Sequence, residues 1–101
     1  MEEITQTLWQ ATEKRKTCRI TLEGEPIPRV VHPYGICRTP KNIIVLVCWQ
    51  AMGFTGAGGK AGFRNLKLSR ILDVEILDAG FRVSPDFNPA DDQYQEWVFH
   101  I

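Results

Sequence analysis

The stretch from Pro26 to Leu72 lacks acidic residues altogether, although the chain carries 12 acidic and 12 basic residues. This acid-free stretch holds seven basic residues: Arg29, Arg38, Lys41, Lys60, Arg64, Lys67 and Arg70. Residues 73–101, in contrast, hold seven acidic residues and only one basic residue. A chain that is neutral in sum but segregated in this way can present a strongly positive surface, which favours anionic partners.

Long apolar runs and regularly spaced cysteines are also missing. The longest apolar run, residues 43–49, is far shorter than the roughly 20 residues that a membrane helix needs. The acidic N-terminus has no apolar core typical of a secretory signal. Cys18, Cys37 and Cys48 are odd in number and widely spaced, which favours reduced thiols over a disulfide framework. We therefore expect a cytoplasmic protein with no membrane partner.

No catalytic or metal-binding pattern stands out. The cysteines and histidines lack a spacing such as C-x-x-C, and no nucleophile has an identifiable base. Residues 56–62 invite comparison with a phosphate-binding loop, but the residues after them alternate as a strand, and Lys60 is followed by Ala61 in place of Ser or Thr. We interpret this segment as a loop between strands. The sequence predicts neither an enzyme, nor a metal site, nor a cofactor.

Alternating apolar and polar residues predict about five short strands within a single domain, residues 1–101. The alternating or apolar segments are residues 17–22, 27–38, 43–50, 63–70 and 71–77. No helix between them is long enough for a parallel crossover, so we expect a mainly β fold. Its expected form is a small five-stranded antiparallel barrel over residues 17–77. Pro28 and Pro33 indicate either an edge or a bend in the second strand.

Two short helices are expected to flank this barrel. Over residues 2–15, Ile4, Leu8 and Ala11 share one helical face. A C-terminal extension with a second helix is predicted over residues 88–101, because its start offers an Asn cap, a Pro at the first helical position and acidic residues in the first turn. The aromatic face of this helix would pack on the chain's own barrel or on a second chain.

Three motifs, taken in order, resemble the WYL domain family. They are residues 29–36 (RVVHPYGI), 44–49 (IVLVCW) and 64–71 (RNLKLSRI). The segment FRVSPDF, residues 81–87, is similar to one that often follows in the family, so the resemblance covers residues from about 12 to about 90. The triplet that names the family is Ile-Val-Leu here, and Lys67 and Ser69 replace an Arg and an Asp of the family pattern. These departures affect which ligand can bind more than they affect the fold.

The resemblance implies an Sm-like or SH3-like barrel, in a stand-alone domain or one isolated from a longer protein. It implies a non-catalytic, ligand-sensing role in bacterial transcription regulation or defence, with single-stranded nucleic acid or a nucleotide as the ligand. Arg29, Arg64 and Arg70 match the family's basic positions and Lys67 matches in charge, so these side chains are expected to contact phosphate. Solvated or ion-paired surface side chains are the alternative interpretation.

Two alternatives remain open from the sequence. Tyr34 suits base stacking among basic residues, but it equally suits the filling of a barrel end. The whole chain, in turn, suits a structural protein-interaction or dimerisation module that does not bind nucleic acid. In that case the contact surface of a homodimer would be the terminal helix, with Tyr94 and Trp97, or a barrel edge.

Overall fold

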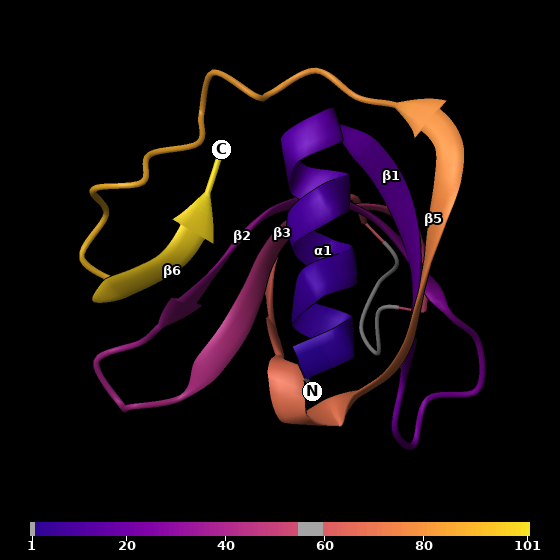
Figure 1. Cartoon of the computed structure of the whole chain (residues 1–101), viewed down its shortest axis with the longest axis horizontal. Helices are drawn as coiled ribbons and strands as arrows, with labels where there is room; N and C mark the ends of the chain where they lie inside the picture. Colours follow the sequence, from indigo (N-terminus) through magenta and orange to yellow (C-terminus); the bar gives the residue numbers. More distant parts are fainter. Residues whose placement is uncertain (1, 55–59) are drawn as a thin grey trace.

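The computed structural model describes residues 2–54 and 60–101, in which one helix lies against six antiparallel strands (Figure 1). The elements are α1 (Glu2–Lys14), β1 (Lys16–Leu22), β2 (Arg29–Arg38), β3 (Ile44–Gly53), β4 (Gly62–Lys67), the 3-10 helix η1 (Leu68–Arg70), β5 (Ile71–Gly80) and β6 (Glu96–His100). The mainly β prediction is confirmed, and each of the five strands expected between residues 17 and 77 has an observed counterpart.

Helix α1 forms where the sequence predicts it and ends one residue earlier. Glu2 and Glu3 lie in its first turn and Lys14 in its last, where each charge complements the helix dipole. Arg15 then adopts a left-handed backbone conformation with φ of 55°, which stops the helix. The buried face, which includes Leu8, docks on the curved sheet (Figure 1). That docking supplies the stability that an isolated helix of this length lacks.

The strand order β4-β3-β2-β1-β5 makes β2 the centre of the sheet. Two strands pair in turn with the same side of β2. Strand β1 pairs with its first residues, as far as Val31, and β6 pairs with it from Gly35 onward. Pro33 lies between these two segments, at a register shift against β3. Because proline has no N–H to donate, it fits the point where β2 exchanges one partner for another. Pro28 lies just before β2, and Pro33 lies at an irregularity of an inner strand and not in an edge strand.

Two cores lie on the opposite faces of this sheet. The helix-side core consists of buried residues from α1, the strands and η1: Leu8, Ala11, Cys18, Ile20, Leu22, Val31, Ile36, Leu46, Cys48, Leu66, Leu68 and Ile71. The tail-side core is built around four buried residues, Tyr34, Cys37, Val45 and Val47, and is covered mainly by aromatic side chains from residues 81–101. The C-terminal segment is thus a cover for the second face of the sheet.

The helix predicted over residues 88–101 is wrong. Asn88 does accept a hydrogen bond from the Ala90 N–H, but the segment continues as successive turns and ends in strand β6. Within β6, Trp97 and Phe99 are half-buried while their neighbours are exposed, which is the period of a strand. The aromatic and β-branched side chains of this segment suit a strand, and β6 pairs with the part of β2 that β1 does not reach.

The closed barrel expected over residues 17–77 is also not observed. The sheet is open, since β4 and β5 occupy its two ends and do not pair with one another in the part of the chain that the structure describes. The segment expected as a single strand from residue 63 to residue 70 instead ends at Lys67. The short helix η1 then turns the chain from one end of the sheet toward the other.

Candidate ligand-binding site

Arg29, at the start of β2, is engaged by neighbouring side chains. Its Nε donates to Glu25 Oε1 at 2.9 Å and its Nη2 to Glu25 Oε2 at 2.8 Å. Its Nη1 donates to Gln50 Oε1 at 2.9 Å, and its guanidinium lies 5.9 Å from the centre of the Phe54 ring. With a residue exposure of only 9%, Arg29 is a buried and satisfied cation.

Arg70, in η1, reaches the same carboxylate from the other side. Its Nη2 donates to the Glu23 carbonyl oxygen at 2.7 Å and lies 3.7 Å from Glu25 Oε2. Its side chain is 46% exposed, while that of Glu25 is only 6% exposed. The structure therefore brings Arg29 and Arg70 together around Glu25, and it leaves Arg70 open to solvent.

Arg64 joins this group through shared neighbours. It pairs across β3 with Cys48, whose side chain lies in the helix-side core. Gln50, the partner of Arg29, pairs with Gly62, and the space beside the Gly62 Cα is occupied by the Arg64 guanidinium. We call Arg29, Arg64 and Arg70 the arginine cluster.

The electrostatic environment of the cluster favours the charged forms of Glu25 and Arg29. The hydrogen bonds from Arg29, helped by the charges of Arg29 and Arg70, hold the pKa of Glu25 below its usual range against the opposing effect of burial. The same hydrogen bonds raise the pKa of Arg29. Burial raises the pKa of the Cys48 thiol to about 12, although the charges of Arg29 and Arg64 act in the other direction. One carboxylate thus faces two arginines, Arg29 and Arg70, while Arg64 is bonded to the carbonyl oxygens of Phe63 and Lys60, so the cluster keeps a positive excess.

Lys67 does not belong to this cluster. It pairs directly with Val45 of the tail-side core, whereas Arg64 pairs with Cys48 of the helix-side core, so their side chains leave β4 on opposite faces. Lys67 is exposed and lines an open cavity of about 400 Å³ with Lys41 and Ile43. The basic residues that were expected to contact phosphate therefore lie on two different surfaces.

Tyr34 lies in the tail-side core and is only 1% exposed. Its ring makes edge contacts with Phe63 and Phe87, and its hydroxyl oxygen accepts a hydrogen bond from the Ser84 N–H at 2.7 Å. The ring thus has no face available for base stacking. Of the two interpretations of Tyr34, the structure favours the filling of the core.

All three cysteines are free and buried. Burial raises the pKa of Cys37, and it raises the pKa of Cys18 to about 12. These thiols are therefore small core side chains and not nucleophiles. Within the described residues, no group of three or more His, Cys, Asp and Glu side chains is placed to hold a metal ion. No helix in that part of the chain is long and apolar enough to cross a membrane.

Glu25 and Gln50 are the residues of this site that the sequence interpretation missed. Glu25 stands four residues before Arg29, a spacing that places the two charges near each other across the turn between β1 and β2. That spacing was the available signal. Gln50 gave no such signal, because only the β2–β3 register brings its amide to Arg29. The glycine-rich segment interpreted as a loop lies mostly outside the described residues.

Comparison with known proteins gives a match at the level of a family. The family model described as WYL domain matches residues 3–76, which include all but the first residue of α1, the strands from β1 to β4 and most of β5. No curated protein and no solved structure matches the chain.

Proposed function

The chain belongs to the WYL domain family, and on this premise we propose that its arginine cluster binds single-stranded nucleic acid or a nucleotide. The family is one of regulatory, ligand-sensing domains and is generally non-enzymatic. The proposed role is accordingly that of a non-catalytic sensor in the cytoplasm of bacteria, acting in transcription regulation or defence. No cofactor takes part in this role.

The observation that carries the proposal is the different engagement of the three arginines. Arg29 has its Nε, Nη1 and Nη2 directed at Glu25 and Gln50. In contrast, Arg64 and Arg70 donate to backbone carbonyl oxygens, which carry no full charge to neutralise them. These two guanidinium groups retain N–H donors for a bidentate bond to phosphate.

Glu25 has a structural part in the proposal. It holds Arg29 at close range, while its oxygen lies 3.7 Å from Arg70, which is longer than a strong charge-assisted hydrogen bond. A phosphate oxygen can therefore take the exposed side of Arg70 without breaking the Glu25–Arg29 pair. Arg64 and Arg70 are then the ligand contacts. Glu25, held by Arg29, positions Arg70, and the Phe63 and Lys60 carbonyl oxygens position Arg64.

The test is a fluorescence-anisotropy titration of labelled single-stranded DNA, single-stranded RNA and a labelled nucleotide at two salt concentrations. We expect binding that weakens with salt and falls at least tenfold when Arg64→Ala and Arg70→Ala are combined. The control combines Arg19→Ala with Arg82→Ala, which removes the same charge outside the cluster. Equal losses in both double variants would show that only net charge matters, and would contradict the proposal.

One observation favours the alternative role as a protein-interaction or dimerisation module. Strand β6 pairs only with β2 in the described chain, so its outer edge is open, and its Val98 is 60% exposed. The aromatic residues Tyr94 and Trp97, expected to drive dimerisation, instead pack on the tail-side core. Sedimentation at high concentration tests this role: a monomer would exclude a homodimer through this edge.

A further inference from the structure

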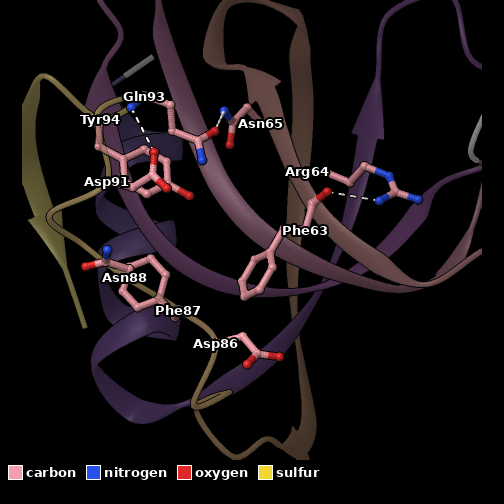
Figure 2. Close-up of a pocket in the computed structure, with 9 residues that line it drawn as sticks. All are labelled: Phe63, Arg64, Asn65, Asp86, Phe87, Asn88, Asp91, Gln93 and Tyr94. Carbon is pink, nitrogen blue, oxygen red and sulfur yellow. Dashed lines mark hydrogen bonds between the residues drawn. The ribbon is translucent and has the colours of Figure 1, made fainter.

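Two cavities adjoin on the tail side of the sheet and share two lining residues. The first has a volume of about 460 Å³ and the second about 400 Å³, both in the range of small-molecule sites. Asn65 of β4 and Gln93 of the C-terminal segment line both. The Asn65 Nδ2 donates to Gln93 Oε1 at 3.0 Å, and Figure 2 shows the two amides facing each other. The cavities therefore form one groove that is divided by an amide bridge.

The first cavity offers aromatic rings and hydrogen-bond acceptors. Phe63, Phe87 and Tyr94 supply the rings, and Asp86 and Asp91 supply carboxylates. Neither carboxylate forms an ion pair with another side chain of the described chain. Such a surface suits a planar group that carries an amino donor.

Arg64, the only cation among the described residues that line this cavity, is directed away from it. The Arg64 guanidinium donates to the Phe63 carbonyl oxygen at 2.9 Å and extends away from the other labelled side chains (Figure 2). It therefore leaves the two carboxylates without a neutralising charge in the cavity.

The second cavity has the opposite character. Its walls include the apolar side chains of Pro40, Ile43 and Val45, and its charged residues are Lys41 and Lys67, both exposed. No carboxylate of the described residues lines it. Two amines beside an apolar wall favour an anionic group, and they act as point charges that tolerate several geometries.

We propose that the two cavities form one bipolar site for a small ligand that joins an amino-bearing aromatic ring to a phosphate. The ring lies among Phe87 and Tyr94 with its amino group donating to Asp91, and the phosphate lies between Lys41 and Lys67. An exocyclic amino group is a good match for a carboxylate acceptor, as in the reading of cytosine by acidic side chains. Nucleotides with an amino-bearing base belong to this class, and those with an oxo group at the same place do not.

This inference rests on the proposed ligand-sensing function but uses a separate surface. Arg64 lines the first cavity, but its guanidinium extends away from the other labelled side chains and leaves β4 on the face opposite Lys67, so the Arg64→Ala and Arg70→Ala changes remove none of the groups assigned to the ligand here. A loss of single-stranded nucleic-acid binding in the arginine variants and a loss of mononucleotide binding in the lysine variants are thus independent results.

The experiment is a calorimetric titration of the full chain with AMP and with IMP, which differ in the amino group. We expect AMP to bind at least tenfold more tightly than IMP, because an acceptor-lined site rejects the oxo group. Combining Asp86→Asn with Asp91→Asn should remove most of that preference. The Asp73→Asn and Asp92→Asn pair is the matched control and should retain it.

The phosphate end is tested separately. Combining Lys41→Ala with Lys67→Ala should weaken AMP at least tenfold, whereas Lys14→Ala with Lys16→Ala should change it less than twofold. A wild-type protein that binds AMP and IMP equally, or that binds neither, would overturn the inference. AMP affinity that survives the Lys41 and Lys67 changes would also overturn it.

Discussion

The Arg29 guanidinium and the Glu25 carboxylate form a two-point ion pair across the turn that joins β1 to β2, with N–O distances of 2.9 and 2.8 Å. Their side chains are only 11% and 6% exposed. An exposed pair of this kind adds about 0–1 kcal/mol to stability, but removing one partner of a buried pair leaves a charge without compensation. The pair therefore anchors this turn, and Arg70 also donates a hydrogen bond to it, at the Glu23 carbonyl oxygen.

Replacing Glu25 with Gln should destabilise the fold strongly. The substitution keeps the shape of the side chain but leaves the buried Arg29 without its counter-charge, a change that costs about 3 kcal/mol in comparable buried pairs. Urea unfolding should show a lower midpoint at pH 7. The control is Glu75→Gln, whose Arg19 partner is 44% exposed, and its free energy of unfolding should change by less than about 0.5 kcal/mol. Equal effects of the two changes would contradict the anchoring role.

Acid should remove the contribution of the same pair. The pKa of Glu25 is lowered in the folded state, so its contribution to stability is present above the unfolded value of about 4.3 and is lost as the pH falls through the folded value. Thermal unfolding between pH 7 and pH 2.5 should therefore show the wild type losing more stability than Glu25→Gln. Parallel curves for the two proteins would mean that the carboxylate does not titrate with folding.

Tyr34→Phe separates the two interpretations of this residue. The change removes the hydroxyl that accepts the Ser84 N–H and should cost about 1 kcal/mol of unfolding free energy. It should leave the affinity for single-stranded DNA unchanged, because the ring is buried in the tail-side core. A substitution that preserved stability but weakened DNA binding would restore Tyr34 as a ligand residue.

Gly35→Ala should detach β6 from the sheet. A Cβ at this position would meet the Phe99 carbonyl oxygen and, at 2.8 Å, the His100 Cα, so the backbone of β6 cannot keep its place. We expect hydrogen exchange to accelerate at the amides that bond to β2, including the Ile101 N–H, whose acceptor is the Tyr34 carbonyl. The control is Gly80→Ala, where the nearest atom to the new Cβ is the Arg15 carbonyl oxygen at 3.3 Å. Unchanged β6 protection in Gly35→Ala would contradict the described pairing.

The thiols should react only after unfolding. The pKa of Cys18 and Cys48 is raised to about 12 by burial, so almost no thiolate is present at pH 8. An aromatic disulfide reagent should modify none of the cysteines rapidly in native protein and all three in urea. Rapid native modification of Cys37 would show that this buried thiol is accessible.

Local sequence patterns were sufficient for most of the fold. Alternation located the strands from β1 to β5, and one-face spacing located α1. Strands β1, β2 and β3 each have several buried residues, whereas β4 buries Leu66 and β5 buries Ile71. The C-terminal segment was misassigned because Tyr94, Trp97 and Val98 fit a helical face while residues 96–100 also alternate. The strand pattern is the one observed because β1 leaves part of β2 free for β6 to pair with. That free part exists only in the assembled sheet and cannot be read from the segment itself.

The candidate site was predictable only in part. The motif order selected Arg29, Arg64 and Arg70. The structure brings Arg29 and Arg70 together at Glu25, and it places Arg64 beside Gly62, the β4 partner of Gln50. The three-residue spacing of Arg64 and Lys67 within one alternating strand already places their side chains on opposite faces. The β3–β4 register shows which core each of these faces borders. A linear sequence could not show that the acidic C-terminal segment and β4 enclose a groove.

The most direct measurement of the central claim is the salt dependence of the affinity for a short single-stranded DNA. Each phosphate contact contributes a slope of about 0.7 in log affinity against log salt for a single strand. The combined Arg64→Ala and Arg70→Ala variant should therefore lower the slope by about 1.4 relative to wild type. The Arg19→Ala and Arg82→Ala control should keep the wild-type slope. The same slope in all three proteins, or no binding by the wild type, would contradict a nucleic-acid site at the arginine cluster.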